Sequence, residues 1–144
     1  MKSIRQRRHK VVIDDFGAGL HVLTAGYSGD GENSASTSTI MAHTVGKAKT
    51  KVKKIKLKPG KPKAGQTAKA TVTVESRSPA TAKPAGKMKV ALDGRTIANV
   101  TVRKGKAKFK LPTPAAGKHK LKVRYNGTGN FAKSSGKTTF NVKK

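Results

Sequence analysis

The sequence predicts an all-β protein whose main part is one antiparallel β-sandwich. Along residues 120–125, apolar Leu121, Val123 and Tyr125 alternate with basic residues. A period of two with one apolar face is typical of a half-buried strand in an antiparallel sheet. Similar stretches recur through residues 52–144, separated by turns rich in glycine and proline. No stretch shows the helical period of about 3.6 residues, so essentially no helix is expected.

The first third of the chain is predicted to contain a single hairpin. Residues 1–17 have a basic start and no consistent period, and we expect them to be irregular. Residues 18–45 are predicted to form strands at 20–27 and 37–45 around a Gly/Asp/Asn turn at 28–34. Two strands alone are marginally stable in water. The segment is therefore expected to be the last hairpin of a sandwich whose earlier strands are missing.

Residues 52–144 are predicted to form a complete immunoglobulin-like antiparallel β-sandwich of about seven strands. The strands are expected at 51–58, 68–75, 87–92, 96–102, 106–111, 120–125 and 138–142. Asp93-Gly94 is a strong signal for a two-residue hairpin turn between the third and fourth strands. Ile97 and Val100 have opposite parity in the fourth strand, which predicts a β-bulge near Asn99.

Part of the chain is repeated. Residues 18–31 read AGLHVLTAGYSGDG and residues 116–129 read AGKHKLKVRYNGTG. The matching residues of the first copy are Ala18, Gly19, His21, Leu23, Tyr27, Gly29 and Gly31, and each counterpart lies 98 positions later, as Gly117 does after Gly19. A spacing of about 100 residues is the length of one sandwich domain, so the hairpin is interpreted as the C-terminal end of a preceding repeat.

The positive charge is concentrated in the second part of the chain. The chain carries 33 Lys and Arg against six Asp and Glu, a net charge of +27. Residues 11–45 contain no basic residue and four acids, whereas residues 46–144 contain 28 basic residues and two acids. This change predicts a domain boundary near Gly46, with a polar linker at 46–51 and the complete domain at 52–144.

Several classes of function are disfavoured by composition. The chain has no cysteine, and therefore no disulfide framework, thiol nucleophile or cysteine zinc site. The basic N-terminus is not followed by an apolar stretch of about 7–15 residues, and no stretch approaches the roughly 18 apolar residues of a membrane span. We therefore expect no export signal and no membrane span in this sequence.

An enzyme is not expected. The complete domain has two acids, Glu75 on an outward face and Asp93 in a hairpin turn, whereas acid–base catalysis needs paired, tuned groups in a pocket. The histidines are His9, His21, His43 and His119. They are scattered, and the two at matching repeat positions are predicted to form hydrogen bonds at strand ends. No catalytic residue, metal site or cofactor is predicted.

Two strands carry a basic outward face, and their residues are the candidate contacts for a polyanion. These residues are Lys106, Lys108, Lys110, Lys120, Lys122 and Arg124. In the immunoglobulin strand order the two strands belong to opposite sheets, so the charge is expected to coat both faces. The functional hypothesis is binding of an anionic cell-wall polymer such as teichoic acid, an acidic polysaccharide or a nucleic acid. The alternative is a solubilising coat that protects sheet edges from pairing.

Sequence-specific recognition of nucleic acid is disfavoured, although non-specific binding stays open. Residues 46–144 contain four arginines against 24 lysines, and arginine is the usual bidentate reader of bases. Their aromatic residues are predicted to belong to the core or to a turn, so none is free to stack on bases. Tyr125 is expected to bond its hydroxyl to nearby backbone, as in a tyrosine corner.

From Val52 to Val142 the sequence resembles a bacterial immunoglobulin-like repeat of the kind found in tandem along surface proteins. The matching phrases are ATVTV, GKMKVALDG, KGKAKFKLP and AAGKHKLKVRYNGTGNF, and GAGLHVLTAGYSGDGENSAS resembles the end of a preceding repeat. The residues expected to have structural roles are Asp93, Gly94, Gly117, Tyr125, Gly127 and Phe131. The repeats usually have an acid where Thr128 stands, and the first copy has Asn33 where the second has Phe131.

The resemblance implies a non-catalytic spacer or attachment module of a bacterial cell-surface or secreted protein, with an extracellular location and neighbouring Ig-like repeats as partners. Two alternatives stay open. One is a polyanion-binding protein that acts through its lysine-rich surface. The other is a decoration protein of a phage particle.

Overall fold

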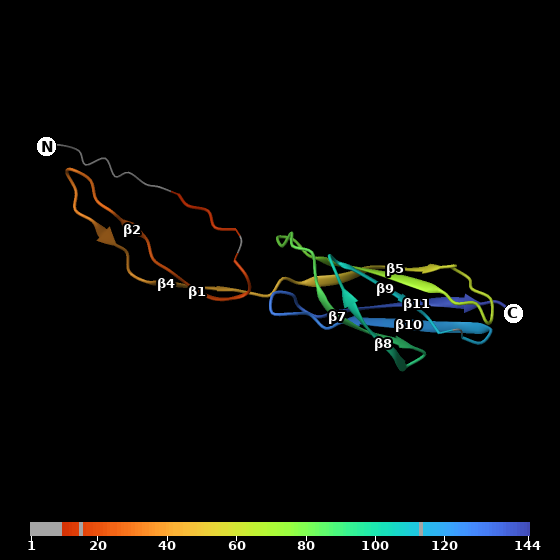
Figure 1. The fold of residues 1–144 in the computed structure, drawn as a ribbon. Coiled ribbons are helices and arrows are strands. Elements are labelled where there is room, and N and C mark those ends of the chain that lie inside the picture. The colour runs from red at the N-terminus through yellow and green to blue at the C-terminus, as the bar shows by residue number, and fades with distance from the viewer. Residues whose placement is uncertain (1–9, 15, 113) are drawn as a thin grey trace. The chain divides into compact units, whose positions relative to one another are not determined.

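A computed structural model describes residues 10–14, 16–112 and 114–144 (Figure 1). All regular structure in these residues is β-strand, arranged in antiparallel sheets as predicted. They form two compact units that divide between Val45 and Gly46, and we call them the hairpin unit and the sandwich unit. The expectations for residues 1–9, including His9, lie outside the described residues.

The hairpin unit contains two short ladders. β1 (Gly19–Leu23) pairs with β4 (Met41–Val45), and β2 (Gly26–Tyr27) pairs with β3 (Ser36–Thr37). Each of the two expected strands is therefore divided into two short strands. The division is unequal, because the gap between β3 and β4 is longer than the gap between β1 and β2. At this irregularity the Ala25 N–H donates to the Ser38 hydroxyl, at 2.9 Å. A side chain thus replaces a ladder acceptor, which the strand pattern does not reveal.

The sandwich unit consists of two sheets and contains all seven predicted strands. They are β5 (Thr50–Lys58), β6 (Lys69–Ser76), β7 (Gly86–Leu92), β8 (Arg95–Val102), β9 (Lys106–Lys110), β10 (Gly117–Tyr125) and β11 (Ser134–Val142). One sheet has the order β5-β6-β9 and the other β11-β10-β7-β8. This is an immunoglobulin-like sandwich, in which β11 begins earlier than expected.

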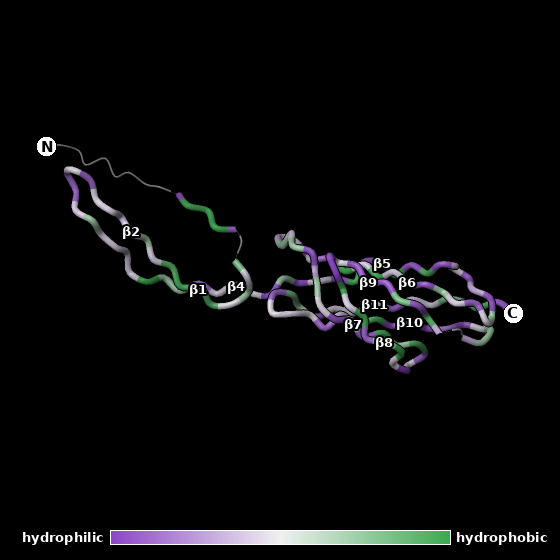
Figure 2. Tube along the Cα trace, viewed as in Figure 1, coloured by the Kyte–Doolittle hydropathy of each residue, from purple (hydrophilic) through white to green (hydrophobic). Residues whose placement is uncertain are grey.

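The core lies between the two sheets and uses the inward positions that alternation predicts. Hydrophilic and hydrophobic residues alternate along these strands (Figure 2). The buried apolar residues are Ala68, Ala70, Val72, Val74, Met88, Val90, Leu92, Val102, Ala107, Leu111, Leu121, Val123, Tyr125, Phe140 and Val142. No charged or polar residue among those described is buried, so apolar burial is the main stabilising term of this unit.

A bulge interrupts β8 close to its expected place. The ladder between β7 and β8 skips Ile97, which lies between the paired residues Thr96 and Ala98. The bulge expected near Asn99 is therefore present two residues earlier. Because the extra residue changes the parity, Ile97 and Val100 both pack against the core.

A second bulge, in β5, has no counterpart among the predictions. The ladder between β5 and β6 skips Lys53, between Val52 and Lys54. Val52 and Ile55 consequently both pack against the core despite their opposite parity. The residues after the bulge, beginning with Lys54, alternate regularly between the two faces.

Residues 46–51, which were expected to form a linker, are hydrogen-bonded into the sandwich unit. The Ala48 N–H donates to the Asn130 carbonyl at 2.8 Å, and the Ala48 carbonyl accepts from the Ala132 N–H at 2.9 Å. Thr50 is the first residue of β5 and its hydroxyl lies 2.7 Å from that of Ser134. The ordered sandwich therefore starts before the predicted domain boundary at 52.

The predicted turn at Asp93-Gly94 and the turn at Lys104-Gly105 have the same compact geometry. Asp93 and Gly94 form the connection between β7 and β8, with φ angles of 49° and 87°. Lys104 and Gly105, which lie before β9, have φ angles of 48° and 75°. Positive φ at both central residues is the signature of a type I′ turn, whose twist matches that of the flanking strands.

Tyr125 connects two strands through its hydroxyl. Its side chain is fully buried, and the hydroxyl donates to the carbonyl of Ala85, just before β7. Burial raises the pKa of Tyr125. The predicted bond to backbone is present, but its acceptor lies 40 positions away in the sequence and not nearby. The bond therefore holds the end of β10 to the start of β7.

Gly127→Ala is expected to lower the free energy of unfolding of the full chain by about 1–3 kcal/mol. Gly127 has a φ of 76°, and a Cβ atom there would lie 2.5 Å from the Phe131 carbonyl oxygen. Gly129→Ala is the matched control, because a Cβ at Gly129 has no atom within 4 Å. Urea unfolding followed by circular dichroism measures both variants, and equal losses would contradict the assigned turn geometry.

Candidate functional site

The outer face of the three-stranded sheet carries an ordered set of lysines. β6 lies between β5 and β9, and residues directly opposite each other share a face. Three rows cross this face: Lys58, Lys69 and Lys110; Lys56, Thr71 and Lys108; and Lys54, Thr73 and Lys106. We call these seven lysines and two threonines the lysine lattice.

We infer a trough along the lysine lattice from the lengths of its side chains. Its two outer strands each contribute three exposed lysines, while the central strand contributes Lys69 at one end and half-buried Thr71 and Thr73 beside it. A threonine side chain is much shorter than a lysine side chain. The floor of the trough is therefore low and hydroxyl-lined, and its two walls are cationic.

The structure places the predicted polyanion contacts in two separate groups. Lys106, Lys108 and Lys110 lie on β9, within the lysine lattice. Lys120, Lys122 and Arg124 lie on β10, which belongs to the other sheet. All six are exposed, and the two groups lie on opposite faces, as the strand order predicts.

Four lysines and both threonines of the lattice were missed from the sequence. Lys54, Lys56 and Lys58 lie on β5, and Lys69 begins β6. The signal was present in the segment KVKKIKLK, where lysines alternate with apolar residues. Alternation identifies an outward face, but it does not show which other strand shares that face.

Both acids of the sandwich unit have cationic partners outside the lattice. A Glu75 carboxylate oxygen lies 3.0 Å from Nζ of Lys53, the bulge residue of β5. An Asp93 carboxylate oxygen lies 2.7 Å from Nδ1 of His119, in the other sheet. No carboxylate stands among the lattice lysines themselves, so their charge is not neutralised within the rows.

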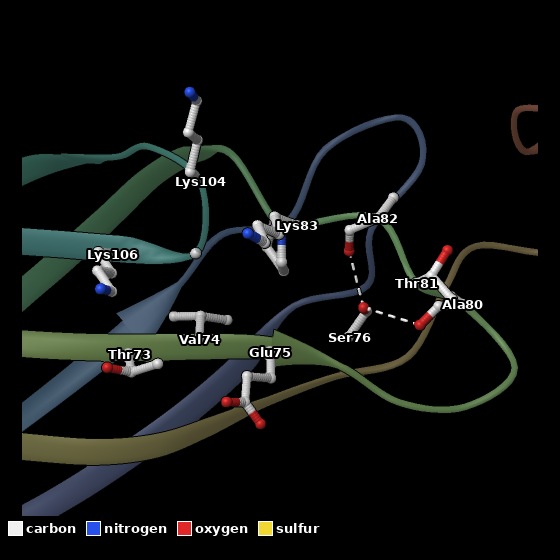
Figure 3. A pocket seen from close by; sticks show the side chains of 12 residues that line it. Thr73, Val74, Glu75, Ser76, Ala80, Thr81, Ala82, Lys83, Lys104 and Lys106 are labelled. Atoms are coloured by element: carbon white, nitrogen blue, oxygen red, sulfur yellow. Dashed lines mark hydrogen bonds between the residues drawn. The ribbon is translucent and has the colours of Figure 1, made fainter.

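A basic cleft of about 360 Å³ adjoins one end of the lattice. Its lining includes three lysines, Lys83, Lys104 and Lys106, and one acid, Glu75. Thr73 and Lys106 of the lattice line it as well. One wall is the loop after β6, where the Ser76 hydroxyl bonds to the carbonyls of Ala80 and Ala82 at 3.0 and 2.7 Å (Figure 3). The cleft continues the cationic wall of β9 around the end of the sheet.

His119 bonds through both ring nitrogens. Nε2 lies 2.8 Å from the Ala115 carbonyl oxygen, and Nδ1 lies 2.7 Å from the Asp93 carboxylate. Both partners are acceptors, so the two bonds favour the imidazolium, the form in which both nitrogens donate. The Asp93 carboxylate, followed by the Ala115 carbonyl, raises the pKa of His119. The His119 bond and the Lys120 N–H lower the pKa of Asp93 in turn.

In the hairpin unit, the carboxylate of Asp30 stabilises the turn between β2 and β3 through hydrogen bonds. Asp30 accepts from the Tyr27 hydroxyl at 2.6 Å and from the backbone N–H groups of Glu32 and Asn33 at 2.9 and 2.8 Å. These bonds, that of Tyr27 first, lower the pKa of Asp30 to about 2. Asp30 and Asn33 occupy the repeat positions of Thr128 and Phe131, so a polar cluster stands where the second copy has an aromatic ring.

The described residues contain no group of three or more His, Cys, Asp or Glu side chains placed to hold a metal ion. Nor does the described part of the chain contain a helix of the length and apolarity that a membrane crossing requires.

His21 and His119 form the strand-end hydrogen bonds that the repeat predicts. Nε2 of His21 lies 2.8 Å from the Gly17 carbonyl oxygen, as Nε2 of His119 lies 2.8 Å from that of Ala115.

The stability contributed by the His119–Asp93 pair is expected to decrease as the pH rises. The pKa of His119 is raised in the folded state, so its contribution is complete below the unfolded pKa of about 6.5 and is lost as pH rises through the folded pKa. The pKa of Asp93 is lowered, so its contribution is present above about pH 4 and lost as pH falls through the folded pKa.

Thermal unfolding of the wild type and His119→Gln between about pH 5 and pH 9 measures this effect. The wild type should exceed the variant most at about pH 5, and the difference should shrink toward pH 9. Asp93→Asn is the matched partner variant, and its difference from the wild type should shrink in the same direction. Differences that do not change with pH would contradict the imidazolium assignment.

Comparison with known proteins agrees with the sandwich. A search of curated proteins finds no match. Among solved structures, the chain is similar to the fibronectin(III)-like modules of CbhA from Clostridium thermocellum, with a TM-score of 0.50 and 15% identity. The match covers 91% of this chain and 66% of that chain, and at this identity it shows the fold alone. A model of the family described as bacterial Ig-like domain (group 3) matches residues 55–143. The chain therefore belongs to the bacterial Ig-like domain family, group 3.

Proposed function

We propose that the chain is a non-catalytic structural module, a spacer or attachment domain, of a bacterial cell-surface or secreted repeat protein. Ig-like and fibronectin III-like domain families are typically non-catalytic, and they commonly serve as structural or adhesion modules. The observation that carries the proposal is the path of the chain through the sandwich unit.

The chain enters the sandwich unit at one end and leaves it at the other. Ala48, before β5, forms a parallel bridge with Phe131, just before β11 begins. Lys63, after β5, forms a parallel bridge with Lys143, just after β11 ends. β11 has nine residues, which span about 30 Å at about 3.3 Å each. Entry and exit at opposite ends are what a module in a linear array requires.

The hairpin unit supports an array because it reproduces part of the sandwich unit. Gly29 and Gly127 have φ angles of 84° and 76°, and each begins a turn of the same shape. In those turns the Asp30 N–H donates to the Asn33 carbonyl, and the Thr128 N–H donates to the Phe131 carbonyl, both at 2.9 Å. The turn of the hairpin unit thus has the local geometry of the β10–β11 turn, although its ladders are interrupted and the ladder between β10 and β11 is continuous.

The apolar residues of the hairpin unit are uncovered. Among the described residues, the large hydrophobic side chains that are exposed all belong to this unit: Val11, Val12, Ile13, Leu20, Val22, Tyr27, Ile40 and Met41. Leu20 and Val22 correspond to the outward Lys118 and Lys120, but Tyr125, the counterpart of Tyr27, is fully buried between two sheets in the sandwich unit. The proposal therefore includes a neighbouring Ig-like repeat that supplies the strands which cover this hairpin.

Hydrogen exchange is expected to differ sharply between the two copies of the hairpin. Amides of residues 19–23 lie in a two-stranded ladder, and they should exchange within minutes. Amides of residues 117–121, at the matching repeat positions, should be better protected, because this part of β10 pairs with β11 and Leu121 is buried in the core between the two sheets. Amide exchange of the full chain by NMR measures both segments, and equal protection would remove the argument for missing strands.

The surface location is tested in the organism that makes the protein. Brief trypsin treatment of intact cells is expected to release peptides from residues 46–144, whose lysines are exposed, while a cytoplasmic marker protein stays intact. Lysed cells provide the control for cleavage. Release only after lysis would contradict a surface location, and recovery of the chain with purified phage particles would favour the decoration protein.

A second candidate function, binding of an anionic polymer, is favoured by the lysine lattice. Its rows place lysines on both sides of a hydroxyl-lined trough, without a carboxylate among them. A polymer of negative charge would gain affinity by displacing counterions from such a face. The two functions are compatible, because attachment to a wall polymer is one way in which a surface module adheres.

A further inference from the structure

We propose that the lysine lattice binds a linear phosphodiester polymer of the polyol-phosphate type, which lies extended along β6. The proposal rests on the second candidate function and assigns it a face, a direction and a ligand chemistry. The lattice lies on one sheet only, and the cations of β10 are not part of it.

The geometry of the lattice fits an extended chain. Neighbouring strands lie about 4.8 Å apart, so the lysine walls on β5 and β9 stand about 10 Å apart at their backbones. Along each wall the lysines recur every second residue, a step of about 6.7 Å. A single flexible polymer with regularly spaced anionic groups therefore meets a pair of ammonium groups at each step.

The floor of the trough offers short-range contacts. The hydroxyls of Thr71 and Thr73 are available between the walls, and each can donate a hydrogen bond to a phosphate oxygen. Lys69 closes the row furthest from the cleft, and at the opposite end Lys106 leads to Lys83 and Lys104. The cationic wall of β9 thus continues past the three rows, beside Glu75 and its partner Lys53.

The unbound lattice has unfavourable electrostatics that a polyanion would relieve. Lys69 stands directly opposite Lys58 on one side and Lys110 on the other. Like charges directly opposite each other destabilise a sheet. The only acid on these three strands, Glu75, is paired with Lys53, so the lattice has no internal counter-charge.

The residue types favour phosphate without nucleobases. Lysine binds phosphate as a point charge, and the three strands contain no arginine for bidentate recognition. Phe109, the aromatic residue on these strands, packs against the core and is not on the outer face. A base would therefore find no stacking partner on the lattice, so a polymer that consists of polyol and phosphate alone uses every contact available.

The other sheet provides a matched comparison. On its outer face Lys122 stands opposite Lys137 on one side and Ala91 on the other. Lys122 and Lys137 do not flank a trough, because β10 is a central strand of its sheet and its cations form a ridge. Removing Lys122 and Lys137 changes the net charge by the same amount as removing Lys56 and Lys108, the middle pair of the lattice walls.

The experiment compares Lys56→Thr/Lys108→Thr with Lys122→Thr/Lys137→Thr in the full chain. Affinity for poly(glycerol phosphate) is measured by calorimetry at several salt concentrations, after thermal unfolding has shown that both variants fold. The lattice variant is expected to lose affinity on the order of tenfold at low salt, and its salt slope should fall by about 1.4. The control variant should retain most of the wild-type affinity and slope.

Each other outcome overturns a defined part of the proposal. Equal losses in the two variants would mean that the whole charge binds without a lattice, although polyanion binding itself would stand. No binding by the wild type at low salt would remove the polyanion function. Tighter binding of single-stranded DNA would show that bases contribute, and equal binding of hyaluronate would show that phosphate is not required. Either result would overturn the assigned ligand chemistry.

Discussion

The register between neighbouring strands is the constraint on which both the core and the lysine lattice depend. Val72 of β6 stands opposite Ala107 of β9, and both are buried. The next residues along the ladder, Thr71 and Lys108, face the other way. A shift by one residue would exchange the two faces and expose the core. The register of the outward rows is therefore fixed by the packing of the inward ones.

Most of the sandwich could be predicted, because the alternation of apolar and polar residues identifies both where a strand lies and which of its residues face the core. The second bulge shows what alternation leaves out. Val52 and Ile55 have the same opposite parity that located the bulge of β8, so the signal was present but lay in a run rich in lysine. At the interruption of the hairpin strands, the Ala25 N–H donates to the Ser38 hydroxyl. Such a bond follows from tertiary geometry and leaves no periodic trace in the sequence.

The candidate site could be predicted only in part, for a different reason. The outward lysines of β9 are visible in the sequence, and so in principle are those of β5. What joins Lys56 to Lys108 is the strand between them, and β6 pairs with β9 across the whole β7–β8 hairpin. Periodicity assigns residues to a face of one strand, but the order of strands in a sheet is a property of the fold.

Comparison of the two hairpin copies separates what the fold requires from what it permits. Lys118 and Lys120 of β10 correspond to Leu20 and Val22 in the repeat, so its outward positions accept apolar side chains. The positive charge of the sandwich unit is therefore an addition to the fold. A solubilising coat explains the sign of this charge, but not its arrangement. Lysines stand directly opposite one another in the row of Lys69, where interspersed acids would solubilise the sheet without repulsion.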